Sequence, residues 1–191
     1  HRDLHSFPTR RSSDLSAQHP TAKPAAAEVA ERRQRLHRLG LVLHPDPLLR
    51  AVCAPVVRFD STLRDLLEAM DDLMTGHGGI GLAGPQVAIK QRLLVCRIGE
   101  RSLRLMNPEV RAAGISGWLT EGCLSLPDTL VTVLRPERIE VKGYDERGGR
   151  RSFSATGLWA RVIQHELDHL NGVLILESTG TVLAACGLAH T

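Results

Sequence analysis

Two histidines near the end of the chain lie four residues apart with a glutamate beside the first, in His165-Glu166-Leu167-Asp168-His169. Residues four apart share one face of a helix, so both imidazoles can reach one metal ion while Glu166 reaches a bound water. With nine histidines in the chain, chance gives this HExxH pattern in roughly a few per cent of shuffled sequences. The pattern alone therefore indicates a metal site, with two surface histidines on an amphipathic helix as the alternative.

The pair of histidines lacks a third ligand, because a catalytic site of this type has three protein ligands and one open position. One extended form of the motif needs a histidine six residues beyond His169, where the chain has Ile175. A glutamate from a later helix is excluded as the third ligand, since Glu177 is the only glutamate that follows and it comes too soon after His169 in the chain. The remaining candidate is Cys123, in the segment Glu121-Gly122-Cys123-Leu124-Ser125.

The elements that position these residues follow from the spacing of apolar side chains. Asp60 or Ser61 begins a helix whose apolar positions recur every three or four residues: Leu63, Leu66, Leu67, Met70 and Met74. A last helix is expected over about 156–171, with Gly172 after its end. Short β-type runs are expected at about 93–98, 103–110, 130–134, 138–144 and 150–154. This order predicts an α+β fold with mainly antiparallel strands around the C-terminal helix that carries the HExxH pattern.

Composition sets the class of protein. The 191 residues are 42% hydrophobic and 24% charged, which is typical of one globular domain. A net charge of +3 from scattered side chains predicts no binding to nucleic acid. No apolar run approaches the length of about 18 residues that a membrane helix needs, and the N-terminal residues lack the order of a secretory signal. We expect a cytoplasmic protein. The alternative is an organellar transit segment, but such segments are poor in acidic residues and this one contains Glu28 and Glu31.

Three motifs in fixed order identify a family. They are Gly79-Ile80-Gly81-Leu82-Ala83-Gly84-Pro85-Gln86, Glu121-Gly122-Cys123-Leu124-Ser125 and the segment His165–His169. With them, and with His44-Pro45-Asp46-Pro47, the chain resembles the peptide deformylases over about residues 41–177. The resemblance implies a metal-dependent hydrolase that removes the N-formyl group from the initiator methionine of nascent polypeptides and releases formate. Its partners would be N-formylmethionyl peptides near the ribosome.

The resemblance also assigns the central roles. Cys123, His165 and His169 would hold one divalent metal ion, Fe2+ or Zn2+, with Ni2+ or Co2+ also suited to these ligands. Glu166 would act as the general base that takes a proton from the attacking water and returns it to the departing amine.

Further residues are implied around that centre. The side-chain amide of Gln86 and the backbone N–H of Leu124 would stabilise the oxyanion. The glycine-rich segment Gly79, Ile80 and Gly81 would bind the peptide, with Ile80 beside the methionine side chain. Glu121 is expected to support a ligand from behind, paired with Arg135.

Two positions depart from the family pattern. Gly84 stands where alanine is usual, which would loosen the turn. Arg161, one turn before His165, stands where an apolar residue commonly lines the pocket. A cation there would alter substrate choice or extend to water. Two other functions compete: an HExxH metallopeptidase that does not need Cys123, and an inactive deformylase-like binding protein.

The ends of the chain are expected to lie outside the domain. Residues 1–15 resemble a translated sequencing adapter, so we expect an artefact without structure, with a natural polar tail as the alternative. Residues 16–40 are expected to form a flexible or helical arm, and 178–191 a tail of uncertain origin. This leaves 41–177 as the catalytic domain.

Overall fold

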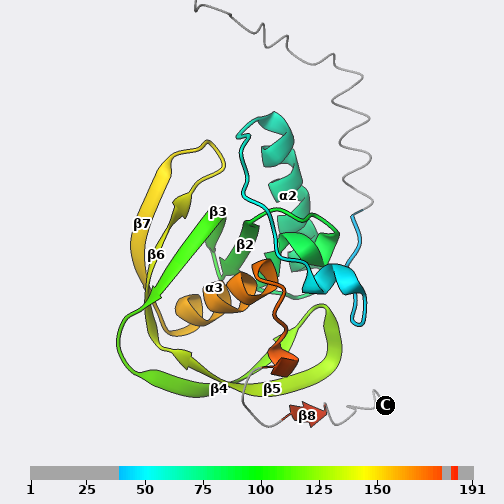
Figure 1. Cartoon of the computed structure of the whole chain (residues 1–191), viewed down its shortest axis with the longest axis vertical. Coiled ribbons are helices and arrows are strands. Elements are labelled where there is room, and N and C mark those ends of the chain that lie inside the picture. The colour runs from blue at the N-terminus through cyan, green and yellow to red at the C-terminus, as the bar shows by residue number, and fades with distance from the viewer. Residues whose placement is uncertain (1–38, 178–181, 185–191) are drawn as a thin grey trace, which may run out of the picture.

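The computed structural model of the chain describes residues 39–177 and 182–184, which combine two antiparallel sheets with two α-helices (Figure 1). The predicted α+β class is confirmed. The expectations for residues 1–15, for nearly all of the arm and for most of the tail lie outside the described residues. Within the described ranges, no helix combines the length and apolar character needed to cross a membrane.

The strands divide into two sheets. The larger sheet has the order β1-β2-β3-β6-β7 and every neighbouring pair in it is antiparallel. Its strands are β1 (Gly81–Ala83), β2 (Leu93–Ile98), β3 (Arg101–Ala112), β6 (Arg138–Tyr144) and β7 (Arg150–Thr156). The smaller sheet has the order β4-β5-β8, formed by β4 (Ser116–Cys123), β5 (Leu126–Pro136) and β8 (Val182–Ala184). Part of the expected tail is therefore a strand paired with β5.

Helix α2 begins where expected, and helix α3 begins and ends within a residue of the expected bounds. Helix α2 spans Ser61–Gly76, and the Asp60 carboxylate caps it by accepting a hydrogen bond from the Leu63 N–H. Helix α3 spans Gly157–Leu170 and is followed by Gly172 at a positive φ of 74°. The described residues also form three short 3-10 helices: η1 (Pro47–Arg50), η2 (Gly84–Val87) and η3 (Ile175–Glu177).

The larger sheet is covered by a helix on each face. Successive side chains of a strand point to opposite faces of the sheet. Leu93 of β2 therefore packs among buried apolar side chains of α2, whereas Leu94 packs among those of α3. Helix α3 also contacts β5 of the smaller sheet. Figure 1 shows α3 lying between the larger sheet and the β4–β5 hairpin. The helix with the HExxH pattern is therefore the element shared by the two sheets.

Candidate metal centre

Three side chains from two elements meet at one point. Cys123 ends β4, whereas His165 and His169 lie on α3, and one ligand atom of each lies within 4.8 Å of the others. The Cys123 Sγ is 3.2 Å from the His169 Nε2. Bond lengths of about 2.3 Å to sulfur and 2.0–2.1 Å to nitrogen place two ligands of a tetrahedral ion about 3.5 Å apart. The spacing and the sulfur–nitrogen donor set therefore both fit a divalent transition metal.

Local backbone geometry brings Cys123 to this point. The pairing of β4 with β5 is regular from Ser116 to Gly122 and shifts between Gly122 and Cys123. Such an irregularity re-aims the side chain that follows it. On α3 the two histidines are one turn apart, and their ring centroids are 5.1 Å apart. The strand end and one helix face thus present their donors to the same space.

Glu121 lies behind His165 and fixes the orientation of its ring. The Glu121 Oε2 is 3.0 Å from the His165 Nδ1, and because a carboxylate only accepts, Nδ1 carries the proton. Nε2 is then the ring nitrogen that stays free to bind a cation. Arg135 donates to both carboxylate oxygens, from Nε at 2.8 Å and from Nη2 at 3.0 Å, so the expected pair is present. Burial alone would raise the pKa of Glu121, but hydrogen bonds from His165 and Arg135 lower it to about 2.

The electrostatics of the two histidines differ. Burial lowers the pKa of His165, but its hydrogen bonds to Cys123 and Glu121 outweigh this and raise the pKa to about 10. The negative groups that favour a proton on the His165 ring would equally favour a metal cation, which takes the place of the Nε2 proton when it binds. Burial, and then the charges of His165 and Arg135, lower the pKa of His169 to about 3, so this imidazole is neutral as a ligand must be.

Glu166 has the properties of a base. Its side chain is 3% exposed, and its Oε2 has no hydrogen-bond partner among the described residues. Burial raises the pKa of Glu166 to about 7, although the charges of His165 and Arg135 partly oppose the shift. Glu166 also lines a cavity of about 520 Å³ beside Cys123 and His165. A carboxylate with an unpaired oxygen at the cavity wall is able to exchange a proton with a molecule bound there.

Gln86 lines the same cavity, and hydrogen bonds fix the orientation of its side-chain amide. Its Oε1 accepts the Ala83 N–H at 2.8 Å, which leaves Nε2 as the donor, 3.2 Å from the Ser125 Oγ and 3.7 Å from the Cys123 Sγ. Leu124 lines the cavity immediately after Cys123. The two expected oxyanion donors therefore lie on the side of the site that carries the sulfur.

The glycine-rich segment 79–81 forms one wall of the cavity. A Cβ added at Gly81 would overlap the Glu166 Oε1 and lie 2.8 Å from the Val162 Cγ1. A Cβ at Gly79 would lie 2.6 Å from the Leu124 Cδ1. Ile80 between them is 40% exposed beside the cavity. The glycines thus leave the space that Glu166 and Leu124 occupy.

We expect Gly81→Ala to lower kcat by about 100-fold, because the added Cβ would displace Glu166, the expected base, and a shift of roughly 1 Å at a reacting group has that order of effect. Gly76→Ala is the matched control, since an added Cβ there meets no atom within 4 Å. The two variants are compared in steady-state assays with equal metal content. Equal activity of the two variants would show that a Cβ at position 81 does not displace the Glu166 carboxylate.

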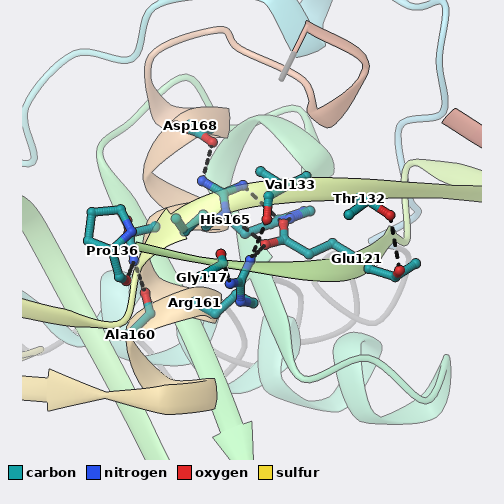
Figure 2. A network of polar contacts seen from close by, with 12 residues as sticks. Gly117, Glu121, Thr132, Val133, Pro136, Ala160, Arg161, His165 and Asp168 are labelled. Atoms are coloured by element: carbon teal, nitrogen blue, oxygen red, sulfur yellow. Dashed lines mark hydrogen bonds and ion pairs between the residues drawn. The ribbon is translucent and has the colours of Figure 1, made fainter. Parts of the chain in front are cut away.

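The two departures from the family pattern have structural explanations. A Cβ at Gly84 would lie 2.6 Å from the carbonyl oxygens of both Ile89 and Gln91, so glycine permits a close backbone approach and does not loosen the turn. Arg161 does not extend to water: it is 8% exposed and donates to Glu121 and to backbone carbonyls. Figure 2 shows Arg161 directed at Glu121 and Gly117. This buried ion pair was missed because the sequence offers no signal for it.

Comparison of the sequence with known proteins identifies its family. The family model described as Polypeptide deformylase matches residues 39–182. The chain belongs to the peptide deformylase family. A peptide deformylase of Hydrogenovibrio crunogenus is 44% identical over 146 residues, which are 74% of this chain and 86% of that protein. The family assignment favours deformylase activity over the alternative of an unrelated metallopeptidase.

Solved deformylase structures share the fold. The Thermotoga maritima peptide deformylase superposes with a TM-score of 0.72 at 40% identity, covering 73% of this chain and 96% of that one. The peptide deformylase of Synechococcus elongatus, solved in complex with actinonin, gives a TM-score of 0.72 at 43% identity over 74% of this chain and 78% of that one. Deformylases are hydrolases that remove the N-formyl group from nascent peptides, and this is the function of the chain.

Proposed function

We propose that Cys123, His165 and His169 together hold the single divalent metal ion of this deformylase. The observation that carries the proposal is the approach of one sulfur and two imidazole nitrogens within 4.8 Å of one another. When bound, such an ion polarises the formyl carbonyl and makes water a stronger nucleophile. Fe2+ and Zn2+ both suit these ligands, as do Ni2+ and Co2+, because sulfur and imidazole donors accept all four.

Glu166 is the proton carrier in this proposal. Its carboxylate takes a proton from the water that adds to the formyl carbon, and then delivers a proton to the nitrogen as the C–N bond breaks. Formate and a free amino terminus leave. A base that must also act as an acid works best with a pKa close to the operating pH, and burial places the pKa of Glu166 at about 7.

Gln86 and Leu124 stabilise the negative oxygen of the tetrahedral intermediate through N–H donors. We expect Gln86→Ala to lower kcat by about 100- to 1,000-fold, the usual cost of one such donor. Gln91→Ala is the matched control because Gln91 is exposed. Steady-state kinetics with a formylated peptide measure both variants. A loss confined to KM would contradict the oxyanion role.

The peptide binds along the glycine-rich wall. Segment 79–81 offers backbone with little side-chain bulk, against which an extended peptide can align. The methionine side chain enters the cavity of about 520 Å³ beside Ile80. This arrangement suits a flexible N-terminus emerging from a ribosome in the cytoplasm, with contacts to the peptide and none to nucleic acid.

Anaerobic purification with metal analysis, followed by assay of two peptides, tests the proposal. We expect one metal ion per chain, formate release from formyl-methionyl peptides, and little release from acetyl-methionyl peptides, because an added methyl group crowds the reacting carbon. Equal turnover of the two peptides, or full turnover without metal, would contradict it.

A further inference from the structure

Arg161 joins the metal-binding helix to both strands of the β4–β5 hairpin. Its Nη1 donates to the Glu121 Oε1 at 2.9 Å and to the Val133 carbonyl at 3.1 Å, and its Nη2 donates to the Gly117 carbonyl at 2.8 Å. Glu121 and Gly117 lie on β4, whereas Val133 lies on β5. Figure 2 shows this guanidinium between the helix and the two strands. One side chain thus fixes the position of α3 against β4, the strand that ends in Cys123.

Arg161 also completes the set of donors around Glu121. The Oε1 accepts from Arg135 and Arg161, and the Oε2 accepts from Arg135 and His165. A carboxylate has about four lone-pair sites, so all of its accepting capacity is used. The carboxylate that orients His165 is therefore held from three directions and has no freedom to rotate without breaking a buried hydrogen bond.

The charge of Arg161 is needed at this position. Arg135 forms ion pairs with two carboxylates, Glu121 and Asp168, and its Nη1 donates to the Asp168 Oδ2 at 2.7 Å. Arg161 supplies a second cation beside the same buried carboxylate. Removing one partner from such a buried network leaves a charge without its compensation. The carboxylate would then shift toward Arg135 and away from the place where it meets His165.

We propose that Arg161 is a positioning residue, which holds Glu121 and the β4–β5 hairpin so that His165 and Cys123 stay within reach of one metal ion. This inference rests on the metal centre proposed above. Arg161 lines the substrate cavity, but it donates its hydrogen bonds to Glu121 and to backbone carbonyls of β4 and β5. Its influence on the reaction therefore passes through the metal ligands and not through the substrate.

Cobalt-loaded protein gives a readout that does not depend on turnover. Co2+ absorbs in the visible range, and a Co2+–thiolate bond adds a charge-transfer band that reports Cys123. We would measure this spectrum and the rate of cobalt transfer to a chelator for the unsubstituted protein, Arg161→Met and Arg161→Lys. The matched control is Arg104→Met, which breaks another arginine–carboxylate pair, the one between Arg104 on β3 and Asp71 on α2.

We expect Arg161→Met to release cobalt about 10- to 100-fold faster and to lower kcat by a similar factor with little change in KM, as is typical when the support of a metal ligand is lost. Arg161→Lys keeps the charge but cannot span Glu121 and Gly117 at once, so it should restore part of the difference. Arg104→Met should release cobalt at the rate of the unsubstituted protein.

Unchanged cobalt release and spectrum in Arg161→Met, with a change only in KM or in thermal stability, would overturn the inference and leave the metal centre intact. If Arg161→Met fails to fold, Arg161→Lys decides: release at the unsubstituted rate overturns the positioning role. Absence of the thiolate band from the unsubstituted protein would overturn the metal centre itself, and the role of Arg161 with it.

Discussion

Replacing Glu166 with glutamine should remove most turnover and leave the metal in place. Glutamine keeps the size and shape of the side chain but cannot accept the proton of the attacking water, and a general base of this kind contributes about 100- to 10,000-fold to the rate. Glu166 supplies no atom to the group formed by Cys123, His165 and His169. We therefore expect kcat to fall by that factor in Glu166→Gln, with one metal ion per chain as in the unsubstituted protein.

The control for this prediction is Glu68→Gln, an exposed glutamate on the other α-helix. Metal analysis and steady-state assay of a formyl-methionyl peptide are run on both variants. If Glu166→Gln keeps more than a third of the activity, Glu166 is not the proton carrier. If it loses the metal, its role is structural.

Replacing Cys123 with serine should weaken metal binding and abolish turnover at limiting metal. Zinc sites with four protein ligands gain about 10–16 kcal/mol at neutral pH, so one ligand accounts for about 3 kcal/mol, or about 100-fold in affinity. A hydroxyl keeps its proton where a thiol loses it, and is a poor ligand for a soft metal. Titration of Cys123→Ser with Zn2+ against a competing chelator measures the loss.

Cys53→Ser is the control for Cys123→Ser, because Cys53 is a buried free cysteine outside the metal centre. We expect it to bind metal like the unsubstituted protein, at some cost in stability. Full metal binding and activity in Cys123→Ser would favour a site that uses only the HExxH residues, which is the metallopeptidase alternative.

Much of the framework could be predicted from local patterns. The apolar spacing and the Asp60 cap predict the start of α2 to within a residue, and apolar spacing with Gly172 predicts α3. The run Leu93-Leu94-Val95-Cys96 predicts a strand, and the structure explains its continuous apolar character by a helix on each face. These features depend on residues close together in the chain, so the sequence carries their signal.

The rest depends on contacts between distant residues. Strand β4 was not predicted, because Ser116–Cys123 contains two glycines and the buried charge of Glu121, and so lacks simple alternation. The strands form two sheets because β4 pairs with β5 and not with the strands of the larger sheet. The spacing of apolar residues along the chain does not predict which strands pair. Arg161 was expected to face substrate or water because its partners, Glu121, Gly117 and Val133, are 28 to 44 residues away.

Helix α3 packs against both sheets. The proposed ligands lie on both sides of the contact between this helix and the smaller sheet, with Cys123 on the sheet and the two histidines on the helix. A cation bound by all three is then linked thermodynamically to folding. Each tenfold rise of free metal above the dissociation constant adds about 1.4 kcal/mol to the free energy of unfolding. The supply of metal in the cell would thus affect the stability of the folded enzyme as well as its rate.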